Sequence, residues 1–96
     1  MSESDYSTAL TAIANERERQ KTIEGFSTDQ DDGYLDNQLS RAAHAYTDPC
    51  ISKDVPASWP WRPEWWKPKT YRENLVRAGA LIAAEIERLD RITPPQ

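Results

Sequence analysis

Residues 59–91 read WPWRPEWWKPKTYRENLVRAGALIAAEIERLDR, and this stretch decides the fold because it joins a tryptophan-rich segment directly to a helix. All four tryptophans of the chain lie in its first eight residues. Pro60, Pro63 and Pro68 each fix a φ angle and remove a backbone donor, which argues against a helix or a central strand. We therefore expect an extended, partly polyproline-like segment that presents its indoles from a stiff backbone.

The residues after Pro68 have the pattern of an amphipathic helix. Thr70 followed three residues later by Glu73 is a capping box, which predicts the first turn. Thr93 precedes two prolines and so predicts the end, because the residue before proline avoids the α region. One apolar stripe, at alternating steps of four and three, consists of Leu75, Gly79, Ile82, Ile86 and Leu89. The opposite side of the helix is expected to face water and carries the i,i+4 pairs Glu73–Arg77 and Glu87–Arg91.

Small residues are frequent in this helix and predict close packing. Gly79 costs about 1 kcal/mol against alanine in a helix interior, so a packing reason is expected for it. The alanines around Gly79 would let another backbone approach closely. The apolar fraction of the whole chain is only 38%. We therefore predict a homo-oligomer that forms through this helix.

Two further helices are predicted upstream. The first starts at Ser4 or Asp5, both good N-caps, and runs to about Glu24, with Gly25 as the residue after its end. Its second half, ERERQK at 16–21, is polar all round, so it needs partners or stands in water. The second helix covers about 34–46, with an apolar line at steps of four, three and four: Leu35, Leu39, Ala42 and Tyr46.

These elements predict an all-α fold, in which three helices carry the Pro/Trp-rich extended segment packed across them. Ninety-six residues make a single domain spanning 1–96, with residues 1–5 and 93–96 frayed. Residues 47–58 (TDPCISKDVPAS) have no helical period and are expected to be a loop, with at most a short extended piece at 50–51.

Composition excludes several classes of protein. The net charge of −4 argues against general nucleic-acid binding and against binding to anionic membranes. No apolar run approaches the roughly 20 residues that cross a bilayer. The first ten residues lack the basic and apolar regions of a signal peptide. Cys50 is the only cysteine, so no intrachain disulfide forms, and a cytoplasmic location is expected.

Metal and enzyme sites are weakly indicated. Asp29 and Asp31 have the first spacing of an EF-hand loop, but the following glycine is misplaced and Ser40 stands where glutamate is needed, so no metal is expected. His44 is read as a surface histidine. Glu87 and Asp90 have the Glu-x-x-Asp spacing of all-α nucleotide pyrophosphatases, but the matching Glu-x-x-Glu helix is missing. We predict neither catalysis nor a cofactor.

The tryptophan segment is the candidate binding site. Residues 62–77 hold five basic and two acidic side chains, a local charge of +3. Indoles stack on nucleobases and arginines bind phosphates, so this composition suits a nucleotide. The structural alternative is that the tryptophans form a lid over the helical core and the basic residues are only solvated or stacked. The candidate ligand-binding residues are Trp59, Trp61, Arg62, Trp65, Trp66, Lys67, Arg72 and Arg77.

The order of several motifs resembles a family of small proteins encoded by tailed phages and prophages. The similarity covers about residues 13–91, and Phe26 stands where the family has tryptophan. It implies a phage accessory protein that acts in a bacterial cytoplasm. The motifs are EGF at 24–26, DD at 31–32, RAA at 41–43, WPW at 59–61, WWKP at 65–68, NLVRAGALI at 74–82 and EIERLD at 85–90.

A weaker similarity concerns the ryanodine-receptor repeat domain. That module also has a glycine-aromatic step, an acidic turn, a Pro-Trp segment and a helix opened by arginine. In this chain those features are Gly25-Phe26, Asp31-Asp32, Pro60-Trp61 and Arg72. Bacterial versions of the domain are suspected readers of nucleotide-derived signals, so this similarity implies a nucleotide ligand.

Two functions are therefore expected as alternatives. The first is a phage anti-defence protein that sequesters a nucleotide immune signal, of the cyclic nucleotide or cyclic ADP-ribose type, without turning it over. The second is an inhibitor or adaptor that binds a host defence protein or a phage protein through its tryptophans, because Trp, Tyr and Arg are also the usual hot-spot residues of interfaces.

Overall fold

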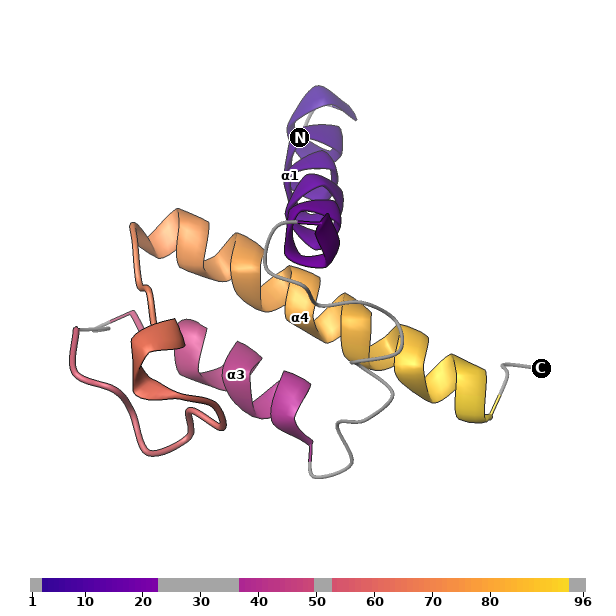
Figure 1. Cartoon of the computed structure of the whole chain (residues 1–96). Coiled ribbons are helices and arrows are strands. Elements are labelled where there is room, and N and C mark those ends of the chain that lie inside the picture. The colour runs from indigo at the N-terminus through magenta and orange to yellow at the C-terminus, as the bar shows by residue number, and fades with distance from the viewer. Residues whose placement is uncertain (1–2, 23–36, 50–52, 94–96) are drawn as a thin grey trace.

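The C-terminal helix α4 (Tyr71–Ile92) is the element on which the other helices pack. In the computed structural model, which describes residues 3–22, 37–49 and 53–93, α1 (Glu3–Thr22) and α3 (Gln38–Tyr46) both contact α4. Figure 1 shows α3 alongside α4, whereas α1 leaves α4 at a steep angle. The described residues contain helices and no strand, so the predicted all-α class is confirmed.

The capping box at the start of α4 forms as predicted. The backbone N–H of Glu73 donates to Thr70 Oγ1 over 3.2 Å, and the Thr70 hydroxyl donates to the Glu73 carboxylate over 2.9 Å. These bonds satisfy one of the free N–H groups of the first turn. At the other end, the Thr93 N–H still donates to Leu89 O before the prolines. The predicted helix bounds are therefore correct to within a residue.

The helix α3 is shorter than the predicted 34–46. It begins at Gln38 after Asn37, which takes the left-handed conformation with φ 62°. Asparagine tolerates this conformation better than most residues, and a helix cannot extend back through it. Residues 34–36, including Leu35 of the predicted apolar line, lie outside the described residues. The rest of that line is buried as expected: Leu39, Ala42 and Tyr46.

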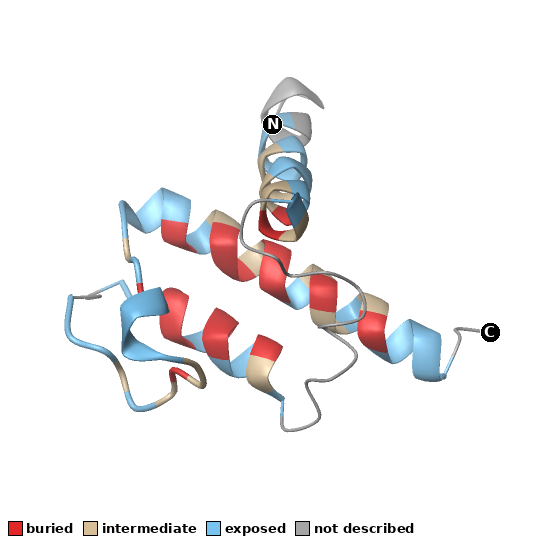
Figure 2. Ribbon diagram, viewed as in Figure 1, coloured by how far each residue is buried: buried red, intermediate tan, exposed pale blue. Residues whose placement is uncertain are grey.

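The core combines alanines with a cluster of aromatic rings. Trp66 stacks on Tyr46 with ring centroids 4.8 Å apart, and Trp59 meets Tyr46 edge-on at 5.5 Å. Leu39 and Leu81 are the large aliphatic side chains that are fully buried. Small alanines let α3 lie close to α4, and Figure 2 shows the buried positions of the two helices facing each other. Two of the tryptophans are thus core residues.

The polar half of α1 finds partners on α4. Arg17 and Gln20 are buried, and Arg17 Nε donates to Glu87 Oε1 over 2.8 Å. The apolar Leu10, earlier in α1, is half exposed. The sequence left two possibilities for this polar half, protein partners or water, and the structure shows protein partners. The charged run at 16–21 therefore supplies part of the surface by which α1 docks on α4.

Two expectations about α4 are wrong. Arg77 is buried beside Glu16, and Glu87 pairs with Arg17 of α1. The expectation that Glu73–Arg77 and Glu87–Arg91 are pairs on a solvent-facing side is therefore wrong. The large side chains of the apolar stripe, in turn, do not pack on the described helices, since Leu75, Ile82, Ile86 and Leu89 are all exposed, whereas Gly79 of the same stripe meets α1. The face that packs on α3 carries Asn74, Leu81 and Ala84, which the stripe does not include.

Gly79 has the expected packing reason, but the neighbour belongs to the same chain. A Cβ added there would lie 3.0 Å from Ile13 Cδ1 of α1. The small residue therefore serves the crossing of α1 over α4. The close approach of a second chain at Gly79 is not needed to explain it.

The tryptophan segment is mostly extended, as predicted, with one exception. Residues Pro63–Trp65 form the short 3₁₀ helix η1. The expectation that this part contains no helix is wrong because Pro63 takes the first position, where the missing N–H costs nothing and the fixed φ is already helical. Predictions for Gly25, the acidic loop at 27–33 and the extended piece at 50–51 fall outside the described residues. No described helix has the length and apolar character needed to cross a membrane.

Candidate functional site

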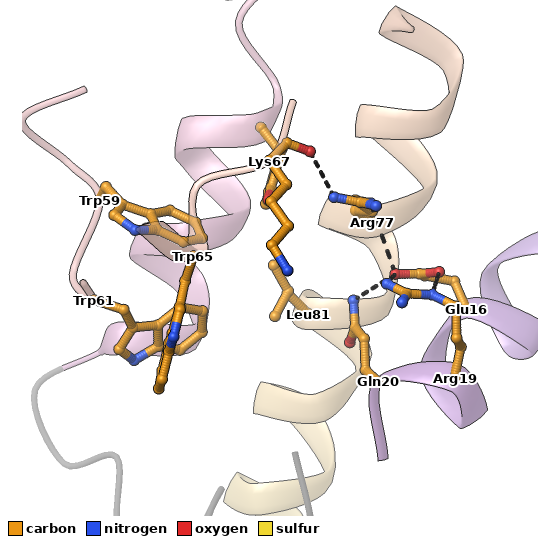
Figure 3. A pocket seen from close by; sticks show the side chains of 10 residues that line it. Glu16, Arg19, Gln20, Trp59, Trp61, Trp65, Lys67, Arg77 and Leu81 are labelled. Carbon is orange, nitrogen blue, oxygen red and sulfur yellow. Dashed lines mark hydrogen bonds and ion pairs between the residues drawn. The ribbon is translucent and has the colours of Figure 1, made fainter. Parts of the chain in front are cut away.

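A cavity of about 360 Å³ lies between the tryptophan segment, α4 and the second half of α1. Figure 3 shows three tryptophans on one side of it and polar side chains of α1 on the other. Its size falls at the lower end of the range of about 300–1,000 Å³ that is usual for small-molecule sites. The lining residues are Glu16, Arg19, Gln20, Tyr46, Trp59, Trp61, Trp65, Lys67, Arg77 and Leu81.

The aromatic wall is a set of rings in mutual contact. Trp59 meets Trp61 edge-on at 5.3 Å, and the indole N–H of Trp59 donates to Arg62 O over 3.0 Å. Trp65 stands at the rim and is 44% exposed. Edge-to-face contacts of this kind are favourable and restrict ring rotation. The wall is therefore largely preformed, with Trp65 as the indole that remains open to solvent.

Two buried polar side chains of α4 hold the backbone that carries Lys67. Asn74, which is fully buried, accepts a hydrogen bond from Lys69 N over 2.8 Å and donates to Lys69 O over 3.2 Å. Arg77 Nη1 donates to Lys67 O over 2.7 Å. The hydrogen bonds of Asn74 and Arg77 thus hold the residues after and before Pro68, whose ring already fixes the local φ angle. Lys67 is thus presented from a rigid backbone.

The polar wall is built around the carboxylate of Glu16. Arg19 donates to both of its oxygens, each over 2.7 Å, and Gln20 Nε2 donates over 3.1 Å. Arg77 Nε approaches Oε2 to 4.0 Å from α4, and its guanidinium also lies 5.8 Å from the centre of the Tyr46 ring. Burial raises the pKa of Glu16, but the hydrogen bond and charge of Arg19, with Gln20 and Arg77, outweigh burial and hold the pKa below its ordinary value.

Lys67 is the cation that faces the open space of the cavity. Figure 3 shows its side chain lying between the tryptophans and Arg19. None of the ion pairs found within the described residues includes Lys67. The cavity lining carries three basic residues and one acidic residue, a net charge of +2, on a chain whose net charge is −4. The wall charges therefore favour an anionic ligand.

The amide of Gln20 is held in place within the polar wall. Its Nε2 is bound to Glu16, which fixes the orientation of the amide because the amide oxygen cannot donate to a carboxylate. The oxygen, Oε1, is buried and makes no hydrogen bond in the described structure. A buried acceptor without a donor costs roughly 1–3 kcal/mol.

The structure brings together five of the eight predicted site residues: Trp59, Trp61, Trp65, Lys67 and Arg77. Trp66 is instead a core residue stacked on Tyr46, as the structural alternative expected for the tryptophans. Arg62 is exposed and lies 3.6 Å from Glu64. Arg72 lines a smaller cavity of about 210 Å³, beside Lys69 and Glu73, and not the main one.

Sequence reasoning missed the contribution of α1. Glu16, Arg19 and Gln20 line the cavity, although they lie far from the tryptophans in sequence. The available signal was the polar run at 16–21, which was recognised as needing partners. Nothing in its spacing indicated that those partners were at the cavity.

The other candidate groups take ordinary positions. His44 is exposed on α3, as predicted, and Glu87 is occupied by Arg17. Within residues 3–22, 37–49 and 53–93, no three histidine, cysteine or acidic residues gather as a metal site requires. Cys50 lies outside the described residues. The arrangement in the cavity is suited to stacking a planar group and to holding negative charge.

Comparison of the chain with protein-family models, with curated proteins and with solved structures finds no match. The cavity itself is therefore the feature from which a function is inferred.

Proposed function

We propose that this protein binds a nucleotide-derived signal, of the cyclic nucleotide or cyclic ADP-ribose type, and sequesters it without turnover. The observation that carries the proposal is the position of Lys67, whose ammonium lies between an aromatic wall and a wall that bears two arginines. An indole provides a stacking surface for a base, and a lysine provides a charge for a phosphate. Together they match the two chemically distinct parts of a nucleotide.

The biological setting is part of the same proposal. The motif order that resembles small tailed-phage and prophage proteins supports a phage accessory role in the bacterial cytoplasm, with the captured nucleotide acting in host defence. Capture without reaction suits the cavity, because Glu16 is held ionised by Arg19 and Arg77. A carboxylate held in this way is a poor proton donor at neutral pH.

Calorimetry against a panel of cyclic nucleotides, linear nucleotides and cyclic ADP-ribose isomers tests the proposal. Trp65→Ala should weaken binding by about tenfold or more, since stacking contributes roughly 1–3 kcal/mol per base. Lys67→Ala should weaken it at least tenfold, because charged hydrogen bonds contribute ~1.5–3 kcal/mol. Arg62→Ala is the matched control: it removes a nearby charge that does not line the cavity, so affinity should change less than about twofold.

Two outcomes would contradict the proposal. One is the absence of binding to every member of the panel at millimolar concentration. The other is chemical change of a bound ligand, detected when the ligand is released by heating and identified by mass spectrometry. An intact nucleotide recovered after prolonged incubation is the expected result.

The rival function is an adaptor that binds a host defence protein through its tryptophans. An interface of that kind needs accessible anchors. Trp59 and Trp66 are buried, which leaves Trp65 and the half-buried Trp61 for such a contact. The adaptor predicts that Trp65→Ala abolishes capture of a host protein, with no small ligand in the purified sample. The burial of two tryptophans favours the cavity over the adaptor.

A further inference from the structure

A second, smaller cavity adjoins the main one and is also lined by basic side chains. It measures about 210 Å³ and lies between the start of α4 and the second half of α1. Glu16, Arg19 and Arg77 line both cavities, so one layer of side chains forms a wall of each. Figure 3 shows this shared wall, in which Arg77 lies between the Lys67 carbonyl and the Glu16 carboxylate. The other residues of the small cavity are Lys69, Arg72, Glu73 and Val76.

The segment 67–69 runs along both cavities. Lys67 lines the main cavity and Lys69 lines the small one, and two residues of extended chain span at most about 7 Å. Asn74 holds the backbone of Lys69 through two hydrogen bonds. Arg77 holds the carbonyl of Lys67. The two lysines are therefore anchored a short and fixed distance apart, one at each cavity.

The charges of the small cavity favour an anion. Lys69 and Arg72 are exposed, and neither forms an ion pair with another described residue. The two acidic side chains already have partners, since Glu73 belongs to the capping box of α4 and Glu16 is bound by Arg19. Four basic and two acidic residues give the lining a net charge of +2.

The two cavities together carry more positive charge than one phosphate needs. Their combined lining has five basic and two acidic residues, a net charge of +3 on a chain whose net charge is −4. A single phosphate beside Lys67 would leave Lys69 and Arg72 without an anion. A second phosphate on the same ligand would reach them across the wall that the two cavities share.

We propose that the ligand carries two phosphate groups, one in each cavity. The first lies at Lys67, and the second lies at Lys69 and Arg72. This inference rests on the proposed function and narrows it, because a cyclic mononucleotide would leave the small cavity empty. The pyrophosphate of a cyclic ADP-ribose and the two phosphates of a cyclic dinucleotide both supply the required chemistry. A bound anion also compensates Arg72 for its place in the first turn of α4, where the helix dipole disfavours a positive charge.

Calorimetry with the 5′-mono- and diphosphates of adenosine, guanosine, cytidine and uridine tests the second phosphate. For the base that binds most tightly, the diphosphate should bind at least tenfold more tightly than the monophosphate, because the added phosphate gains charged hydrogen bonds. In the Lys69→Ala/Arg72→Ala double variant this preference should fall below about twofold, with the affinity for the monophosphate nearly unchanged. Arg62→Ala removes a charge from the tryptophan segment but lines neither cavity, so it should keep the preference.

Cyclic ADP-ribose and cyclic di-AMP distinguish the two arrangements of phosphates. Whichever of them the wild type binds should lose affinity at least about fivefold in the double variant. Cyclic AMP, which has one phosphate, should lose less than about twofold. Trp65→Ala should weaken all three alike, because the aromatic wall contacts the base and not the second phosphate.

The unliganded double variant provides the fold control. Lys69→Ala keeps the backbone groups that bind Asn74, and neither substituted side chain takes part in an ion pair of the described structure. Its melting temperature should therefore lie within about 2 °C of the wild type. If the double variant is unstable, Arg72→Gln alone makes the same measurement of phosphate preference.

Three outcomes would overturn the inference, and only the last would also overturn the proposed function. Equal affinity of the wild type for mono- and diphosphates would show a site for one phosphate. A preference for diphosphates that survives in the folded double variant would place the second phosphate elsewhere. Binding of no nucleotide at millimolar concentration would remove both the site and its extension.

Discussion

Glu16 is the residue at which α1, α4 and the cavity meet. It is the acidic member of the cavity lining and neutralises part of the charge of Arg19 and Arg77. Its side chain is 11% exposed, so solvent screens these contacts little. One carboxylate therefore has two effects: it stabilises the crossing of α1 over α4, and it reduces the positive charge that a ligand meets.

The pKa of Glu16 makes the stability of the protein depend on pH. The pKa of the folded state lies below the ordinary value of 4.5, so the carboxylate stabilises the fold fully above that value and loses its effect as the pH falls through the lower, folded pKa. Glu16→Gln should lower the free energy of unfolding by roughly 1–3 kcal/mol at neutral pH. The difference from the wild type should shrink on acidification below about pH 4.5.

Thermal melts between pH 3 and pH 7 measure this difference. Glu18→Gln is the control, because Glu18 lies on the same helix but is 70% exposed and pairs only loosely with Lys21, over 3.4 Å. A Glu16→Gln variant as stable as the wild type at every pH would show that the carboxylate is not held as described.

At the scale of elements, the crossing of α1 over α4 depends on Gly79. Alanine there would gain about 1 kcal/mol of helix propensity, but its Cβ would crowd Ile13 Cδ1 at 3.0 Å. We expect Gly79→Ala to be nearly neutral alone and to stabilise the protein by ~0.5–1 kcal/mol relative to an Ile13→Ala background, which lacks both Cδ1 and Cγ1, the atoms 3.0 and 3.1 Å from the added Cβ. Gly79→Leu should destabilise it by roughly 1–3 kcal/mol through overpacking.

Urea denaturation of the four variants gives these free energies. The coupling between positions 13 and 79 is the decisive quantity, since residues in contact deviate from additivity. A Gly79→Leu protein with wild-type stability but altered mass would instead mean that Gly79 contacts a second chain.

Local signals in the sequence predicted local structure well. The capping residues Thr70 and Glu73 and the prolines after Thr93 placed α4, because capping and proline geometry depend on neighbours in the chain. The direction in which α4 faces could not be predicted. Its apolar stripe indicates a helix with an apolar side, but the core selected the face with Leu81 and Ala84, where small residues permit close contact with α3.

Only the part of the candidate site that lies within one stretch of sequence could be predicted. Trp61, Trp65 and Lys67 are close in sequence, so composition alone revealed them. The contribution of Glu16 depends on an ion pair that joins residues far apart in the chain, and a charged run has no periodicity from which a tertiary partner can be read.

At the scale of the whole molecule, α4 supplies the surface on which the other described helices depend. Both α1 and α3 pack on it, and Asn74 and Arg77 on α4 hold the tryptophan segment. A fragment of residues 1–70 should therefore lack a cooperative thermal transition and the near-ultraviolet circular dichroism of the stacked Tyr46 and Trp66 rings. Wild-type protein measured under the same conditions is the reference, and a native-like aromatic spectrum from the fragment would contradict this dependence.

The position of α4 in the chain has a consequence for synthesis in the cell. A ribosome adds about 5–20 residues per second, and it makes α1, α3 and the tryptophan segment before the helix that joins them. The charged half of α1 and the indoles therefore emerge without the partners that later bury them. Folding must wait for α4, so α1, α3 and the tryptophan segment should lack their native packing until α4 has left the ribosome. A translation product that ends before α4 would expose its aromatic rings and should be degraded readily by proteases.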